Sequence, residues 1–430
     1  MDLLAYLTDN LARFLFDFAF YYPLFMSYLW MVGALYYYFH WERTLSESPE
    51  DVPSLDAYPG VSILVPCHNE GENIRETVSF LMDQKYPEFE IIAINDGSED
   101  GTGEILDALA EESDKLRVIH LASNQGKAMA LRMGALASRN EYLIGIDGDA
   151  LLDPNATTWI MSHLTSGPRV GAVTGNPRVR NRSTLLGKLQ VGEFSSIIGL
   201  IKRAQRIYGR VFTISGVVAG FRKAALQSVG YWSPETLTED IDISWKLQLH
   251  HWDVRYEPNA LCWILMPETI MGLWRQRLRW AQGGSEAMMK YSNMFGAWRL
   301  RRMWPIYFEY FVSVAWSYTM ITIVILWVLG KFVALPPNLY VATLLPGWNG
   351  VILGMTCLMQ FAVSLAIDSR YERRLSRYYY WMIWYPLVYW FINVLTTVVA
   401  LIKTIFRKRG KRGKWRNTDR GLRPQETASS

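Results

Sequence analysis

The chain is poor in cysteine: its three cysteines, Cys67, Cys262 and Cys357, are scattered and form no CxxC pair. The odd number argues against a disulfide framework and for a reducing compartment, and the missing CxxC pairs argue against a structural zinc site. Charged residues are also scarce, at 20% of 430 residues against 50% hydrophobic ones. This composition excludes intrinsic disorder and fibrous repeats, and it predicts a folded domain combined with membrane segments.

Outside the C-terminal tail, the chain has no excess of positive charge. Residues 403–430 hold ten Lys and Arg against Asp419 and Glu426, so they contribute +8 to a formal total of +4 and the remaining chain carries about −4. A mildly acidic body lacks the basic surface that nucleic-acid binding requires, so we expect no nucleic-acid partner.

Long apolar runs occur near both ends of the chain. The run at 14–39 is long enough to cross a bilayer and lacks the cation cluster of a signal peptide, which predicts an N-terminal transmembrane segment within residues 1–40. Further runs at 306–330, 347–367 and 378–402 predict a C-terminal transmembrane region over 299–402, followed by the basic tail 403–430.

Three residues interrupt the C-terminal runs: Glu309, Pro386 and Asn393. Either they face the interior of a helix bundle, because facing lipid would be costly, or they mark helix ends and snorkelling side chains. Four full spans would place the polar middle of the chain and the basic tail on opposite sides of the membrane, although both favour the cytoplasm. We therefore expect one miscounted span, with 378–402 as a re-entrant or interfacial segment.

Residues 41–298 separate the two apolar regions, and in them short apolar runs alternate with helical patterns. This alternation is typical of an α/β domain with a doubly wound sheet. Ligands of such sheets bind beyond the carboxyl ends of the strands. We expect strands at 61–65, 91–95, 116–120, 142–146 and 170–174, and helices at 74–84, 103–110, 127–137 and 156–164.

Carboxylates follow two of these strands, with Asp96 after 91–95 and the Asp-x-Asp pair Asp147 and Asp149 after 142–146. A dinucleotide-phosphate turn is excluded, because Gly101 and Gly103 lack the third glycine of that pattern and the carboxylates would repel an anion. The pair suits a hard divalent cation that keeps waters and bridges substrate phosphates. The alternative is that Asp and Gly are ordinary turn residues here.

Three further candidates lie downstream. Lys127 begins a predicted helix and is either a solvated first-turn residue or a counter-charge for a pyrophosphate. Asp240, in the sequence Thr-Glu-Asp, precedes a helical run and could serve only the helix dipole. Gln276, Arg279 and Trp280 belong to an aromatic and cationic stretch that could be a simple interfacial anchor.

These motifs occur in one order, Asp96, Asp-x-Asp at 147–149, Thr-Glu-Asp at 238–240 and Gln-x-x-Arg-Trp at 276–280, between membrane segments. The ordered set resembles the pattern of processive family 2 glycosyltransferases, which include synthases of cellulose, chitin, hyaluronan and poly-β-1,6-N-acetylglucosamine. Segments 173–178, 192–203 and 241–249 are most similar to the last group, and the similarity runs from about residue 14 to 420.

The resemblance implies a GT-A-like, Rossmann-like catalytic domain over 41–298 in the cytoplasm, attached to the bacterial inner membrane by several spans. It implies inverting transfer of N-acetylglucosamine from UDP-N-acetylglucosamine to a growing poly-β-1,6-N-acetylglucosamine chain, which is extruded for the biofilm matrix. It also implies Mg²⁺ or Mn²⁺ as cofactor and membrane lipids, a small membrane partner subunit and cyclic di-GMP as partners.

For the donor side, the resemblance assigns Asp96 to the uridine part and Lys127 to the pyrophosphate. It assigns Asp147 and Asp149 to the donor and the metal, with Asp149 the direct ligand. Metal coordination would offset the charge that grows on the leaving UDP.

For the transfer step, the resemblance makes Asp240 the general base that takes the proton of the acceptor hydroxyl. Gln276 and Arg279 would hold the diphosphate, and Trp280 would stack on the acceptor sugar. A positioned base contributes about 10²- to 10⁴-fold to a rate, which makes Asp240 the most sensitive position.

Three other functions compete with this one. The same machinery could make a chitin-like or hyaluronan-like polymer. A non-processive transferase with a lipid acceptor is disfavoured by the Gln-x-x-Arg-Trp motif and the later spans. A silent membrane transporter or second-messenger receptor would have no reason to keep every acidic motif position.

Overall fold

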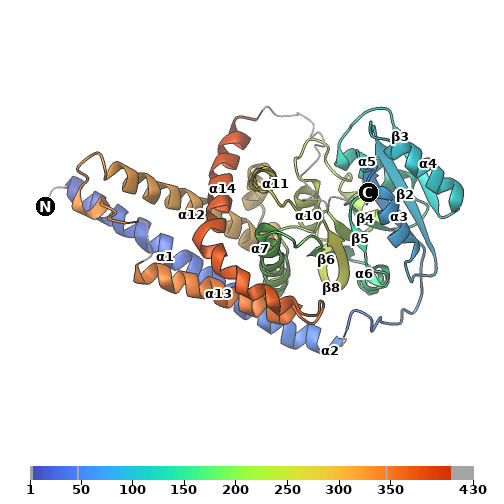
Figure 1. Ribbon diagram of the computed structural model, residues 1–430, viewed down its shortest axis with the longest axis horizontal. Helices are drawn as coiled ribbons and strands as arrows, with labels where there is room; N and C mark the ends of the chain where they lie inside the picture. Colours follow the sequence, from blue (N-terminus) through green and yellow to red (C-terminus); the bar gives the residue numbers. More distant parts are fainter. Residues whose placement is uncertain (1–2, 46–47, 344–346, 408–430) are drawn as a thin grey trace, which may run out of the picture.

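The computed structural model describes residues 3–45, 48–343 and 347–407. The tail arginines and lysines from residue 408 onward lie outside the described residues. Figure 1 shows a sheet covered by helices at one end of the molecule and a group of long helices that extends away from it. The predicted combination of an α/β domain with an α-helical membrane region is confirmed.

The sheet has eight strands in the order β3-β2-β1-β4-β7-β6-β8-β5. Its first four strands are parallel, and every residue of β1 is buried, as expected for a strand covered on both faces. The strands are β1 Val61–Cys67, β2 Phe89–Asp96, β3 Leu116–Leu121, β4 Tyr142–Ile146, β5 Leu151–Leu152, β6 Val170–Val179, β7 Val218–Arg222 and β8 Asp253–Ile264.

Helices connect and cover these strands. The parallel strands alternate with α3, α4 and α5 in the order β1-α3-β2-α4-β3-α5-β4. The helices of this α/β domain, the predicted catalytic domain, are α3 Ile74–Met82, α4 Thr102–Glu112, α5 Lys127–Ala137, α6 Ala156–Thr165, α7 Leu185–Glu193, η2 Phe194–Leu200, α8 Ile201–Ile207, α9 Lys223–Ser228, α10 Glu239–Leu249 and α11 Ile270–Lys290.

The five predicted strands and the four predicted helices are all present, with ends that differ by a few residues. The sheet is nevertheless mixed, because β7 runs antiparallel to both β4 and β6. Strands β7 and β8 were absent from the prediction. The doubly wound pattern therefore holds only for the first half of the sheet.

Among the described residues, three helices are long and apolar enough to span a membrane: Asp9–Glu42, Trp298–Leu329 and Trp348–Asp368. The first is α1 (Leu3–Tyr37) from Asp9 onward with η1 (Tyr38–Glu42), the second is η4 (Trp298–Met303) with α12 (Trp304–Leu329), and the third is α13 (Trp348–Asp368). All three extend from the same side of the catalytic domain (Figure 1). They match the first three predicted spans.

Arg203 of α8 shows how these helices are attached to the catalytic domain. Its Nε donates to Glu42 at 2.6 Å and its Nη1 to Asp368 at 2.9 Å, and all three side chains are nearly inaccessible. Glu42 ends the first span and Asp368 ends the third, so both ends lie at the catalytic domain. The second span, α12, starts there and leads away.

The fourth apolar run is bent. Its two helical parts, Leu375–Leu387 and Trp390–Ile405, meet at 52°, and Figure 1 shows α14 (Trp390–Ile405) lying across the direction of the three long helices. The bend falls at η7 (Tyr385–Tyr389), which contains Pro386. This geometry is that of a broken span or a re-entrant segment, and the re-entrant form is the one that agrees with the charge argument.

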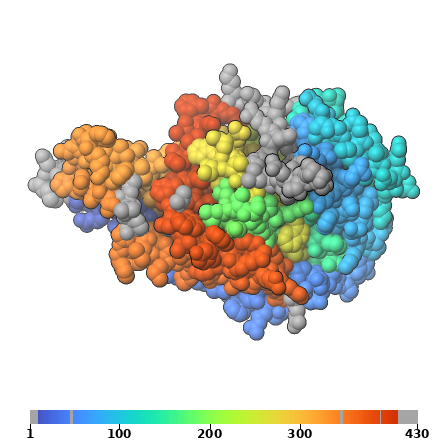
Figure 2. Space-filling view, in the orientation of Figure 1, coloured from blue at the N-terminus to red at the C-terminus, as the bar shows by residue number. Residues whose placement is uncertain are grey.

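The end of this segment returns to the catalytic domain. Arg407 forms an ion pair with Glu286 of α11 and donates to the carbonyl of Glu235 at 3.1 Å. In Figure 2, the surface of the C-terminal segment lies against that of the central region of the chain. With three crossings, the start of the basic tail lies on the same side as the α/β domain, and this count would resolve the mismatch found in the sequence.

Two of the polar interruptions face protein. Glu309 accepts hydrogen bonds from Trp30 at 3.2 Å, Gln205 at 3.0 Å and Tyr208 at 2.7 Å. Asn393 lies within 3.4 Å of Glu193. The bundle-interior alternative is confirmed for these two side chains, because both have polar partners away from lipid.

Candidate active site

Asp96 ends β2 and is completely buried. Its two carboxylate oxygens accept backbone N–H bonds from Gln125 at 2.7 Å and Gly126 at 2.8 Å. Gly126 has φ of +89°, a conformation that favours glycine. Asp96 thus fixes the loop that leads into α5, and its predicted contact with uridine remains a prediction.

Lys127, the first residue of α5, is the centre of a charge cluster. Its ammonium pairs with Asp147 and with Glu239 at 3.1 Å, and it donates to the carbonyl of Gly216 at 3.0 Å. Burial alone would lower the pKa of this ammonium, but the two carboxylates outweigh burial and raise it. Lys127 is therefore a permanent positive charge at the strand ends and not a solvated surface residue.

Asp240 lies in the first turn of α10, beside this cluster. Its Oδ1 accepts the N–H of Ile241 at 2.9 Å, and a Cβ on Gly216 would come within 3.0 Å of its Oδ2. Burial and the charge of Glu239 raise the pKa of Asp240 to about 6, against the opposing effects of Lys127 and Arg279. A carboxylate with this pKa is ionised near pH 7 and still basic enough to accept a proton.

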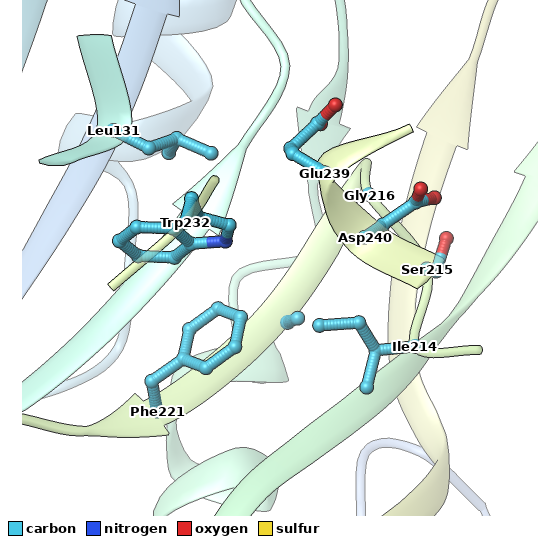
Figure 3. Close-up of a pocket in the computed structure, with 10 residues that line it drawn as sticks. Leu131, Ile214, Ser215, Gly216, Phe221, Trp232, Glu239 and Asp240 are labelled. Atoms are coloured by element: carbon cyan, nitrogen blue, oxygen red, sulfur yellow. The ribbon is translucent and has the colours of Figure 1, made fainter. Parts of the chain in front are cut away.

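A small pocket adjoins Asp240. Figure 3 shows Asp240 and Glu239 at its edge, projecting from the start of α10, with Leu131, Phe221 and Trp232 on the other side. The remaining lining comes from Gly145, Ile214, Ser215, Gly216 and Ala219. The base candidate thus sits where polar strand ends meet an apolar wall.

The Asp-x-Asp segment offers two carboxylates for a metal ion. Asp147 already faces Lys127, and Asp149 is half-buried just after β4. Within the described residues, no group of three or more His, Cys, Asp or Glu is arranged to hold a metal. Two hard oxygen donors in this acidic cluster fit Mg²⁺ or Mn²⁺, which complete their shell with water and substrate phosphates.

The Gln-x-x-Arg-Trp motif lies on α11, which begins after the N-cap Thr269. Gln276 is buried, Trp280 is half-buried and Arg279 is exposed. The charge of Arg279 has a small lowering effect on the pKa of Asp240, the weakest of those that act on this carboxyl. The predicted contact of Arg279 with the diphosphate remains a prediction.

Two charged residues at this site carried no assignment in the sequence analysis. Glu239 is the second acidic partner of Lys127. Lys202 is buried and donates to Thr174 Oγ1 at 3.0 Å, and Thr174 Oγ1 also accepts the N–H of Ser215 at 2.8 Å. Burial lowers the pKa of Lys202 to about 7, although Asp240 opposes the shift. Lys202 belongs to the segment 192–203, whose similarity was its only sequence signal.

Fold and site together have the features of a GT-A-type glycosyltransferase joined to membrane helices: a mixed sheet with an acidic strand-end cluster and, beside it, Asp240 with its raised pKa. A family model described as glycosyl transferase family 2 matches residues 62–230. The poly-β-1,6-N-acetyl-D-glucosamine synthase of Staphylococcus epidermidis is 39% identical over 423 residues, covering 94% of this chain and 98% of that protein. The protein of the same name from Staphylococcus aureus strain COL is 40% identical over 409 residues, with 94% and 98% covered.

A solved structure supports the fold. The mannosyltransferase of Pyrobaculum calidifontis in complex with GDP-Man and Mn²⁺ superposes with a TM-score of 0.62 at 19% identity, covering 93% of this chain and 99% of that one. The chain belongs to family 2 of the glycosyltransferases, as a homologue of the poly-β-1,6-N-acetyl-D-glucosamine synthases.

Proposed function

We propose that this chain polymerises N-acetylglucosamine from UDP-N-acetylglucosamine into poly-β-1,6-N-acetylglucosamine for the biofilm matrix and extrudes the product. The observation that carries the proposal is Asp240, a carboxyl with a raised pKa beside the cationic Lys127. Full-length similarity to synthases of this polymer supports the choice of substrate and product.

In the proposed reaction, the acceptor hydroxyl attacks C1 of the donor sugar from the face opposite UDP. Asp240 takes the hydroxyl proton as the new bond forms, which leaves the configuration at C1 inverted. The positive charges of Lys127 and Arg279 would offset the negative charge that grows on the leaving diphosphate. No Ser or Cys nucleophile is required, because the displacement is a single step.

Asp147 and Asp149 would hold Mg²⁺ or Mn²⁺, with Asp149 the direct ligand, since Asp147 is already paired with Lys127. When bound, such an ion supplies Lewis-acid stabilisation of the diphosphate. Gln276 would contact the diphosphate, and Trp280 would offer its ring to the acceptor sugar. Stacking on a flat ring binds a sugar loosely enough for the chain to advance.

We further propose that the catalytic domain faces the cytoplasm and that the membrane is the bacterial inner membrane. The start of the basic tail lies on the catalytic-domain side, and basic segments next to spans favour the cytoplasm. Membrane lipids, a small membrane partner subunit and cyclic di-GMP are the proposed partners of this region.

The test uses purified membranes with radiolabelled UDP-N-acetylglucosamine and Mn²⁺, followed by linkage analysis of the polymer. The expected product contains only β-1,6-linked N-acetylglucosamine, and the Asp240→Asn enzyme makes it about 10²- to 10⁴-fold more slowly. A β-1,4-linked product, or a requirement for UDP-glucuronate, would replace the proposal with a chitin-like or hyaluronan-like synthase. A labelled lipid without polymer would indicate a non-processive transferase.

A further inference from the structure

Arg277 lies inside the Gln-x-x-Arg-Trp motif, at a position without an assigned role. Its side chain is 4% exposed, whereas the neighbouring Arg279 and Arg275 are exposed. Because α11 turns by about 100° per residue, Arg277 and Arg279 lie on opposite sides of the helix, with Arg277 pointing into the protein and Arg279 exposed. The two arginines of this motif therefore have different surroundings.

The Arg277 guanidinium contacts both the first and the last residue of the motif, Gln276 and Trp280. Arg277 Nη1 donates to Gln276 Oε1 at 3.2 Å, and its Cζ lies 4.3 Å from the ring centre of Trp280. This cation–π contact leaves one face of the Trp280 ring covered by the guanidinium. Phe194 packs obliquely near the same ring, at 6.3 Å between ring centres. Arg277 thus restricts the rotamers of Gln276 and Trp280 together.

The other side of Arg277 is bound to the bent membrane segment. Its Nη2 forms an ion pair with Glu193 at the end of α7 and donates a hydrogen bond to Tyr389 Oη at 3.2 Å. Tyr389 Oη donates to Glu193 Oε2 at 2.7 Å, and Asn393 Nδ2 lies 3.4 Å from Glu193 Oε1. Tyr389 is the last residue of η7, at the bend before α14. A continuous polar chain therefore runs from the bend to Trp280.

This cluster is not expected to contribute much to the free energy of unfolding. A buried ion pair is often no more stabilising than apolar residues of the same volume, since two charges must be desolvated. In addition, Arg277 Nε has no hydrogen-bond partner among the described residues. What the cluster does fix is the geometry of two motif side chains relative to a membrane segment.

We propose that Arg277, held by Glu193 and Tyr389, is a positioning residue. It sets the orientation of the Trp280 ring on the acceptor side according to the conformation of the bent segment 385–405. The inference rests on the proposed function, because it assumes that Trp280 receives the acceptor sugar. A shift at the Tyr389 bend then changes how firmly the growing chain is held between additions. The consequence is that this segment controls product length.

The test is Tyr389→Phe, which removes the hydroxyl bound to Glu193 and Arg277 but keeps the buried ring. We expect the mean product length to fall about fivefold, the equilibrium effect of losing one net hydrogen bond. The rate of UDP release and the affinity for UDP should stay within about twofold. Tyr380→Phe is the matched control, because it makes the same change on a ring that is 75% exposed. It should leave product length unchanged.

A double-mutant cycle separates positioning from mere structural support. If Tyr389 acts through Trp280, adding Tyr389→Phe to Trp280→Ala causes no further shortening. Additive shortening, or unchanged length with Tyr389→Phe alone, would overturn the inference. The melting temperature of each variant is measured as well, and a lower melting temperature with normal product length also counts against it.

The same measurements keep this inference apart from the proposed function. If Trp280→Ala itself leaves product length unchanged, the acceptor role of Trp280 fails, and with it part of the proposed function. If Trp280→Ala shortens the polymer and Tyr389→Phe does not, only the positioning role of the Arg277 cluster fails. Arg277→Lys, which keeps the charge but loses the planar contacts, should behave like Tyr389→Phe.

Discussion

The pH dependence of polymer synthesis provides a direct test of Asp240 as the base. Its pKa of about 6 lies above the ordinary Asp value because burial and Glu239 disfavour the charged form. At pH 7.5 about 97% of such carboxyls are ionised, and at pH 5 about 10% are. We therefore expect kcat/KM to fall about tenfold between these two pH values.

Asp240→Asn removes the base without removing a proposed donor contact. Synthesis should fall by about 10²- to 10⁴-fold, and the residual rate should no longer show an acid limb near pH 6. Affinity for UDP should change only a few fold. The assay is initial-rate incorporation of labelled sugar from pH 5 to 8, with UDP binding measured by calorimetry on the same preparations.

Glu239→Gln is the informative companion variant. The charge of Glu239 raises the pKa of Asp240, so its removal should move the acid limb to lower pH. Near-wild-type synthesis by Asp240→Asn would refute the base assignment. An acid limb near pH 4 in the wild-type enzyme would refute the environment that we describe for this carboxyl.

The pH dependence of protein stability provides a second check of the Asp240 environment, and it does not depend on activity. A carboxyl whose pKa is higher in the folded state binds protons more tightly there, so the free energy of unfolding falls as pH rises from about 4 to about 6. Asp240→Asn removes this cost above pH 6. The variant should therefore melt at a higher temperature than wild type at pH 7.5, and a lower melting temperature would contradict the burial of this charge.

Three further predictions concern other parts of the chain. Asp149→Ala should abolish the metal-dependent part of UDP binding; equal affinities in Mn²⁺ and in EDTA for the wild-type enzyme would contradict the metal role. Asp96→Ala leaves two buried amides without their charged acceptor, so we expect a loss on the order of 3 kcal/mol in stability and weaker UDP binding; an unchanged melting temperature would rule this out. Deletion from Gly413 onward keeps the basic residues next to α14, so membrane insertion should survive; an undiminished response of synthesis to added cyclic di-GMP would show that the distal tail is no part of a regulatory site.

The sequence predicts those features that depend on local pattern. Buried parallel strands are short apolar runs and their helices have regular periodicity, so 61–65, 91–95 and 142–146 were recognised as strands. Strands β7 and β8 were not, because their place in the sheet depends on antiparallel pairing with β4 and on parallel pairing with β6. Such long-range partners leave little trace in local sequence.

For the site, the resemblance of the ordered motifs to those of family 2 glycosyltransferases implied a sugar-nucleotide transferase and roles for Asp96, Lys127 and Asp240. Only the tertiary structure decided how these residues act together. It turned Asp96 inward to hold the loop before α5, paired Lys127 with Glu239, and gave Asp240 its basic character through burial. A pKa depends on distances and desolvation, which a sequence does not contain.

The membrane topology was likewise predicted only in part from the sequence. Length and hydropathy were enough to predict four apolar runs and a basic tail, because they fix which segments can enter a bilayer. The charge argument favoured a re-entrant or interfacial path for the last run, 378–402. Only the structure decided its path, through the 52° bend and the pairing of Arg407 with Glu286, since these contacts join residues more than one hundred positions apart in the chain.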